Sequence, residues 1–429
     1  MGSRSRNLGR IAMANTPSEF AAGWRVLLAS FIGIAIGVSS LYFYSLGIFI
    51  KPMSAEFGWS RADASLGALV GTGCAAIMSI PAGWLVDRFG SRAAALVSLV
   101  LLAASFVALG LMTDGLYTFL VLTAGLSLLT AGSSPLPFTR LVVTAFVRNR
   151  GIALGIVLAG TGMGAILIPR FLTPFVAENG WRLGFLLLAG VCAALTPIVG
   201  LLLIGARDPR TSSVAQDRSA AGRSSPVFVT LAVMFFLTSV AVLGTVVHFV
   251  PMLMDAGVSP ANAGATASLI GVAAICGRLV TGALLDRLTA KWVAAAIFLV
   301  AGAGLLALGL GGPRLNTLGA IVAGVAIGSE VDLIAFLVGR YFPPNAFGRT
   351  YGAIYATFLV GGALGPFAAG QIYDRLNGYS VWLVIASALL GCAACVATWL
   401  PRGAPPDFAG PRGQALESPP RGTAGNVIL

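Results

Sequence analysis

The sequence predicts an all-α membrane protein with twelve transmembrane helices in two six-helix bundles and both termini in the cytoplasm. Of its 429 residues, 57% are hydrophobic and only 10% are charged, whereas a soluble domain carries about 25% charged residues. Apolar runs long enough to cross the ~30 Å hydrocarbon core of a bilayer recur along the chain. The two halves of the sequence also repeat each other, which predicts two equivalent bundles.

Short polar breaks separate the apolar runs into twelve predicted spans. The first run is too long for the core of a signal peptide, and it is therefore expected to be an uncleaved transmembrane helix. The spans cover residues 25–50, 63–86, 92–112, 115–146, 151–176, 182–205, 226–254, 262–286, 291–311, 315–340, 350–373 and 379–400.

The lysines and arginines predict the orientation of these spans. With the N-terminus inside, nineteen of the 27 basic residues fall on the cytoplasmic side and five fall outside. Cytoplasmic loops of membrane proteins carry such an excess. We therefore expect a multi-pass protein of the cell inner (plasma) membrane with both termini inside.

The polar segments divide the chain into five parts. Residues 1–24 are expected to form a cytoplasmic tail, 25–205 the N-terminal bundle and 226–401 the C-terminal bundle. Residues 206–225, rich in Ser, Ala and Arg, form a cytoplasmic linker, and residues 402–429, rich in Pro and Gly, are expected to be disordered.

The charge of +12 invites comparison with nucleic-acid-binding proteins. The basic residues are spread between apolar spans and form no patch, so no nucleic-acid partner is expected. The sequence contains no nucleotide-binding loop, no cluster of metal ligands and no soluble domain. We expect neither an enzyme nor a resident cofactor or metal.

Two internal matches support a duplication. The loop "GWLVDRFGSR" at 83–92 follows span 2, and "GALLDRLTAK" at 282–291 follows span 8, at an offset of 199 residues. A second match at an offset of 197 relates Gly155, Gly164 and Pro169 in span 5 to their counterparts in span 11. Two matches at nearly one offset indicate a repeated six-helix unit.

The loop motif Gly-x-Leu-x-Asp-Arg-x-Gly-x-Arg, with twelve spans and a six-six repeat, resembles the signature of the major facilitator superfamily. The resemblance implies secondary transport by two bundles that rock about a central cavity. It also implies that spans 2, 5, 8 and 11, rich in glycine, meet across the halves. By the same resemblance, charge-assisted contacts of the loop residues hold the cytoplasmic side shut. These gating residues are Asp87, Arg88, Arg92, Asp286 and Arg287; the alternative is simple interfacial anchoring.

Longer stretches resemble bacterial relatives of the monocarboxylate porters and oxalate–formate exchangers. The clearest are "RNRGIALGIVLAGTGMG" in span 5 and "FGRTYGAIYATFLVGGALGPFAAGQIYD" in span 11. In those families an arginine of span 8 faces the cavity and holds a substrate carboxylate, and Arg278 lies at that position. Two departures matter: Ala274 stands where animal porters carry an aspartate, and Tyr44 aligns with a lysine. The residues that couple transport to protons are therefore not implied by the resemblance.

Charges inside the spans are the strongest functional candidates, because a lone arginine at the bilayer centre costs roughly 3 kcal/mol. At 1.5 Å per residue, Arg278 lies about 12 Å from the cytoplasmic end of span 8, and Glu330 lies about 15 Å from that of span 10. Glu330 and Asp332 point about 200° apart around their helix. We therefore expect one of them to pair with Arg278 while the other points elsewhere.

Arg140 lies at a similar predicted depth, about 12 Å from the cytoplasmic end of its span. We consider it, with Arg278, Tyr44 and His248, as a substrate-binding candidate, and Glu330 and Asp332 as proton-coupling candidates. Each has a structural alternative. Arg278 could form a purely structural ion pair, Arg140 could extend to the cytoplasmic surface, Tyr44 could belong to an interfacial aromatic belt, and His248 could be an interfacial histidine.

These features predict a proton-coupled transporter of a small organic anion, either a mono- or a dicarboxylate. A carboxylate exchanger is the main alternative. A proton-driven exporter is disfavoured, because such exporters carry Gly-Pro-x-x-Gly-Gly in span 5, where this chain reads "GTGMGAILIP". The expected partners are the substrate anion, protons and the lipid bilayer, and the chain is expected to act as a monomer.

Overall fold

A computed structural model describes residues 19–146, 149–206, 226–342 and 347–401. In these ranges the chain is helical and contains no β-strand. The first half comprises α2 (Glu19–Ala35), α3 (Val38–Phe57), α4 (Arg61–Phe89), α5 (Ser91–Met112), α6 (Leu116–Leu129), α7 (Pro135–Ala145), α8 (Arg150–Asn179) and α9 (Trp181–Leu202). The second half comprises α10 (Pro226–Asp255), α11 (Pro260–Arg287), α12 (Ala290–Gly311), α13 (Asn316–Tyr341), α14 (Phe347–Leu376) and α15 (Ser380–Thr398).

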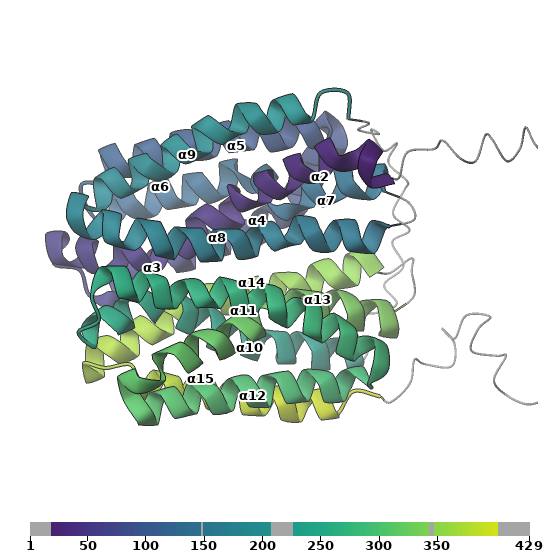
Figure 1. The fold of residues 1–429 in the computed structure, drawn as a ribbon. Helices are drawn as coiled ribbons and strands as arrows, with labels where there is room; N and C mark the ends of the chain where they lie inside the picture. Colours follow the sequence, from purple (N-terminus) through teal and green to yellow (C-terminus); the bar gives the residue numbers. More distant parts are fainter. Residues whose placement is uncertain (1–18, 147–148, 207–225, 343–346, 402–429) are drawn as a thin grey trace, which may run out of the picture.

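The helices form two bundles that lie side by side. Figure 1 shows α2 to α9 in one layer and α10 to α15 in the other, with the long helices roughly parallel. The beginning of α2 and the end of α15 lie at the same end of the molecule. We call this end, predicted to be cytoplasmic, the inner end, and the opposite one the outer end.

Eleven helical stretches in the described residues are long and apolar enough to cross a membrane, with α2 and α3 taken together as one stretch. The remaining predicted span, the fourth at residues 115–146, is also helical but interrupted. It consists of α6 and α7 joined by a short 3-10 turn, Ala131–Ser133. The all-helical fold class is confirmed, and the predicted spans correspond in order to the observed helices.

The first and fourth predicted spans are each interrupted in the structure. Helix α2 begins at Glu19, earlier than the predicted residue 25, and the chain breaks at Gly37 before α3. The fourth span breaks before Pro135, which has no N–H to donate and therefore occupies the first position of a new helix. The two breaks meet, because the Val38 N–H donates to the Ser133 hydroxyl at 3.2 Å.

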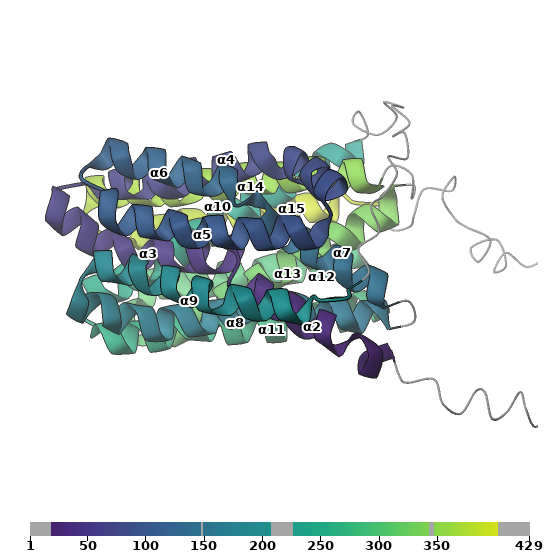
Figure 2. The same ribbon diagram turned by 90° about the horizontal axis from the view of Figure 1, so that it is seen from above.

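The interface between the bundles is built on small residues. Helix α8 lies beside α11 (Figure 2), and α4 packs against α14. A methyl group at Gly162 would lie 2.5 Å from Ile275, and one at Gly271 would lie 2.7 Å from the Gly162 carbonyl oxygen. Such close approach is available only to glycine. The expected meeting of spans 2, 5, 8 and 11 is confirmed.

Candidate functional site

The candidate site forms where α11 and α13 pack within the C-terminal bundle. A side chain at Gly277 would lie 2.9 Å from the Cα atom of Val325, and Gly328 lies directly against the backbone of Ala274. The hydroxyl groups of Thr281 and Ser329 are hydrogen bonded across the same contact at 2.7 Å. Glycines from both helices therefore bring the backbones close enough for short side chains to meet.

Arg278 and Asp332 form an ion pair across this contact. The distance between Nε of Arg278 and Oδ2 of Asp332 is 2.9 Å, and 19% and 27% of the two side chains are exposed. The Nε–H does not point at the oxygen well enough to form a hydrogen bond, so we describe the contact as an ion pair. The expected pairing of Arg278 with one acid of span 10 is confirmed, and Asp332 is that acid.

Glu330 faces a different neighbour. It is fully buried, and neither carboxyl oxygen has a hydrogen-bond partner. Thr238 of α10 lies beside the carboxyl group, but the hydroxyl of Thr238 donates to the Phe235 carbonyl instead. The expectation that the two acids point in different directions is therefore correct.

Two tyrosines interact electrostatically with Arg278. Tyr44 of α3 is within electrostatic range of both Arg278 and Glu330. Tyr351 of α14 is within range of Arg278 and Asp332. The ring of Tyr351 stacks on Tyr355 with centroids 5.8 Å apart. One tyrosine from each bundle is thus within electrostatic range of Arg278.

Arg140 lies elsewhere, which corrects its predicted place in the central layer. Its Nη1 atom is 2.6 Å from Oδ1 of Asp87 in an ion pair between α7 and the inner end of α4. The long guanidinium side chain reaches toward the helix end, as the alternative of an arginine extending to the surface anticipated. Arg140 therefore pairs with Asp87, the first residue of the predicted gating group, and not with the acids of the Arg278 site.

The other residues of the two loop motifs are only partly described. Arg88 is exposed and lies over the rings of Trp84 and Phe89 on its own helix. Arg92 is half-buried and Arg287 is exposed. The side chain of Asp286 lies outside the described residues. The gating role of these residues stays a prediction.

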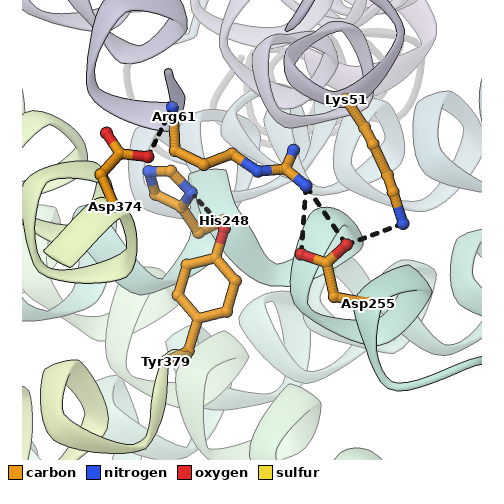
Figure 3. Close-up of polar contacts among 6 residues, drawn as sticks. All are labelled: Lys51, Arg61, His248, Asp255, Asp374 and Tyr379. Carbon is orange, nitrogen blue, oxygen red and sulfur yellow. Dashed lines mark hydrogen bonds and ion pairs between the residues drawn. The ribbon is translucent and has the colours of Figure 1, made fainter. Parts of the chain in front are cut away.

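His248 lies near the outer end of α10, away from the Arg278 layer. It is buried, and its ring nitrogens contact the Ser65 hydroxyl at 3.1 Å, the Pro366 carbonyl at 2.8 Å and the Tyr379 hydroxyl at 3.0 Å. Because the carbonyl only accepts, Nε2 carries a proton in this arrangement. Figure 3 shows His248 among charged residues of both bundles.

Sequence reasoning missed that outer group of charges. Arg61, Asp255 and Asp374 lie at or next to helix ends, and Lys51 lies six residues before the end of α3. In the sequence, the two basic residues of this group served only to predict orientation. The available signal was that two acids and two bases lie in the outer parts of four different predicted spans or their loops. Hydropathy and charge counts say nothing about which of those helix ends are neighbours.

Comparison with known proteins identifies the family. The sequence profile of the Major Facilitator Superfamily matches residues 32–334 and 257–423. Monocarboxylate transporter 11 of Mus musculus is 27% identical over 415 residues, which cover 91% of this chain and 90% of the relative. An uncharacterized MFS-type transporter of Bacillus subtilis is 24% identical, covering 87% and 94% of the two chains.

A third relative and a solved structure agree with this assignment. A probable nitrate/nitrite transporter of Mycobacterium tuberculosis is 28% identical, covering 84% of this chain and 93% of the relative. The crystal structure of a bacterial homologue of the human lysosomal transporter Spinster has the same fold, with a TM-score of 0.68 at 18% identity, and covers 90% of this chain and 97% of that one. The chain therefore belongs to the major facilitator superfamily and is a secondary transporter.

Proposed function

We propose that this transporter moves a small organic anion, a mono- or dicarboxylate, across the cell inner membrane by alternating access coupled to protons. The observation that carries the proposal is the Arg278–Asp332 ion pair, in which Nε and Oδ2 are 2.9 Å apart within apolar helices. A guanidinium group with an exchangeable carboxylate partner is suited to receive a carboxylate from solution.

The pairing fits the energetics of a resting site. A lone arginine within the bilayer is expensive. At ~4 Å and an effective dielectric constant of 20, an ion pair gains about 4 kcal/mol before desolvation. Asp332 therefore makes Arg278 tolerable when the substrate is absent. A substrate carboxylate that replaces Asp332 supplies the same compensation, and a planar carboxylate can bind guanidinium through two parallel hydrogen bonds.

Protonation of Asp332 determines when the substrate carboxylate can replace it beside Arg278. A neutral carboxyl holds Arg278 less strongly, so the guanidinium is released for the anion. The order is then proton first, anion second, and rocking of the bundles third. This sequence of events makes transport of a negative charge depend on a proton that travels with it.

Glu330 is the second candidate for the coupled proton. An ionised carboxylate that is buried without hydrogen bonds is strongly disfavoured, so this site accommodates the protonated form. Asp332 has 27% of its side chain exposed, whereas Glu330 is fully buried. We therefore assign the exchangeable proton to Asp332 and a supporting role in the same layer to Glu330.

The names of the relatives support an anionic substrate. Two of them are a monocarboxylate transporter and a probable nitrate/nitrite transporter. A carboxylate and a nitrate share a planar arrangement of oxygens that a guanidinium group can bind. The absence of an aspartate at Ala274, one turn before Arg278, is offset in this proposal by Asp332 on the neighbouring helix.

Carboxylate exchange is the second candidate function. The same Arg278 site serves it if one anion leaves as another enters, with Asp332 acting only as a placeholder. The two functions differ in their response to a proton gradient, because an exchanger needs an anion on the far side and a symporter does not.

Transport by the purified protein in liposomes separates these functions. A thermal-shift screen against mono- and dicarboxylates and nitrate first identifies an anion that stabilises the protein. Uptake of that anion is then measured with an imposed pH gradient and an empty lumen, and again with a preloaded lumen and no gradient. Symport predicts uptake in the first condition. Uptake only in the second identifies an exchanger, and the absence of anion binding contradicts both.

A further inference from the structure

Two ion pairs bridge the bundles at the outer end. The acid that they share comes from one bundle, and both bases come from the other. Asp255 of α10 accepts contacts from two bases of the N-terminal bundle, with its carboxylate oxygens 2.7 Å from Nζ of Lys51 and 3.1 Å from Nη2 of Arg61. The acid belongs to the second bundle and both bases belong to the first (Figure 3).

Asp374 of α14 makes a different kind of contact with the same bundle. Its two carboxylate oxygens accept the backbone N–H groups of Arg61 and Ala62, each at 2.8 Å. These are the first two residues of α4, and N–H groups in the first turn of a helix have no partner within it. Ser60 satisfies the next one, because its hydroxyl accepts the Asp63 N–H at 3.0 Å.

The cap of α4 is thus completed by the opposite bundle. A carboxylate at a helix N-terminus is favoured both by these hydrogen bonds and by the helix dipole. The contact uses backbone atoms of α4 and not the Arg61 side chain. Asp374 and Asp255 therefore bridge the same two bundles through independent sets of atoms.

Gly370 explains how Asp374 reaches the backbone of α4. It lies one turn before Asp374 on α14, and a methyl group there would be 2.9 Å from both the Cα and N atoms of Ala62. Those are backbone atoms that cannot turn aside as a side chain can. A glycine at this position lets α14 approach close enough for the carboxylate to cap α4.

The contacts are only partly shielded from solvent, because Asp374 is an exposed residue and the Lys51 side chain is 37% exposed. Only 9% of Arg61 is exposed, and its guanidinium lies over the Tyr373 ring at 5.2 Å. Beneath them, the buried His248 links α4 to the second bundle through the Ser65 hydroxyl at 3.1 Å. Its partner Tyr379 lies between α14 and α15, where burial raises the pKa of the hydroxyl, so the hydroxyl keeps its proton as a hydrogen-bond donor. Charge-assisted hydrogen bonds are stronger than neutral ones, so separating Asp255 and Asp374 from their donors opposes opening.

We propose that Lys51, Arg61, Asp255 and Asp374 form an outer latch that holds the bundles together at this end, and that Asp374 acts as the N-terminal cap of a helix in the other bundle. The outer side opens only when both carboxylates leave their partners. These residues thus set the equilibrium between the two states of the transporter without touching the transported anion.

The test measures access from outside to a cysteine beneath the latch. Val247 is suitable, because it is 3% exposed and lies eight residues before Asp255 on α10. Val247→Cys is introduced after replacement of the five native cysteines. Its rate of modification by a membrane-impermeant maleimide is measured on right-side-out vesicles for Asp255→Asn, Asp374→Asn and the double variant.

Each single variant is expected to raise the labelling rate by about tenfold, the order expected for loss of a hydrogen bond to a charged group, and the double variant more. Glu56→Gln is the matched control. Glu56 pairs with Arg182 at the same end, but both residues belong to the first bundle, so labelling should not change. If Glu56→Gln accelerates labelling equally, the latch proposal is wrong. It is also wrong if Asp255→Asn and Asp374→Asn both unfold cooperatively and neither accelerates labelling.

A second comparison isolates the helix cap. Because Asp374 binds backbone N–H groups, Asp374→Asn should accelerate labelling by the same factor whether residue 61 is Arg or Gln. Asp255→Asn should have little further effect once both Lys51→Gln and Arg61→Gln are present. If the Asp374 effect disappears in the Arg61→Gln background, the carboxylate acts through the guanidinium, and the cap assignment is wrong.

Discussion

Glu330 and Asp332 are separated by one residue on α13, yet they face different helices. Asp332 lies 2.9 Å from Arg278 of α11, whereas the fully buried Glu330 lies beside Thr238 of α10. The rotation of about 100° per residue along a helix accounts for the divergence. One acid is therefore partly exposed beside Arg278, and the other is enclosed.

Arg278→Lys should retain the fold and lose most transport. Lysine keeps the charge but cannot bind a carboxylate through two parallel hydrogen bonds, so we expect uptake to fall by roughly tenfold or more. Initial rates in liposomes and the melting temperature are the measurements. Arg170→Lys, on an exposed face of α8, is the matched control. A lysine variant with normal transport rules out the proposed anchor.

Asp332→Asn should separate anion movement from proton coupling. The neutral amide imitates the protonated acid, so anion exchange should persist while accumulation driven by a pH gradient is lost. Exchange should also become nearly independent of pH, because the titrating group has been removed. The two fluxes are compared for the same preparation.

Glu330→Gln provides the comparison for that experiment. The amide resembles the protonated carboxyl in shape, so the unfolding temperature should be nearly unchanged, and accumulation driven by pH should be reduced less than in Asp332→Asn. If neither substitution affects accumulation driven by pH, proton coupling in this chain does not depend on span 10.

Gly328→Ala should disturb the site through packing alone. The added methyl group would overlap the backbone of Ala274, which forces α11 and α13 apart and misplaces Arg278 relative to Asp332. Overpacking of this kind costs typically 1–3 kcal/mol. Gly282→Ala is the control on α11, because nothing lies within 4 Å of its added methyl group. Melting temperature and anion binding should both fall only for Gly328→Ala.

Asp87→Asn should alter transport more than stability. The Asp87 side chain is 59% exposed, and exposed ion pairs contribute about 0–1 kcal/mol. If the pair with Arg140 holds the inner end of α4 during rocking, uptake should slow severalfold while the melting temperature stays nearly constant. The exchange Asp87→Arg with Arg140→Asp should restore part of the rate. Asp114→Asn, an exposed acid bonded to nearby Thr118, serves as the control.

The sequence by itself determined the fold class and the repeat. Apolar runs long enough to cross a bilayer have little alternative to a helix, because backbone groups must satisfy one another where water is absent. The spacing along a helix also predicted that Glu330 and Asp332 diverge and that Arg278 needs an acid partner. These conclusions depend on residues that are near one another in the chain or at equal depth.

The tertiary structure decided which acid that partner is and which distant groups meet. The predicted depth of Arg140 along its span put it in the same layer as Arg278, but its flexible side chain reaches Asp87 instead. Asp374 contacts the backbone of residues 61 and 62, more than three hundred positions earlier. Backbone N–H groups have no residue-specific signature, and their contact with Asp374 depends on the close approach of α14 at Gly370. Such contacts follow from the packing of whole helices, which hydropathy and charge counts along the chain do not encode.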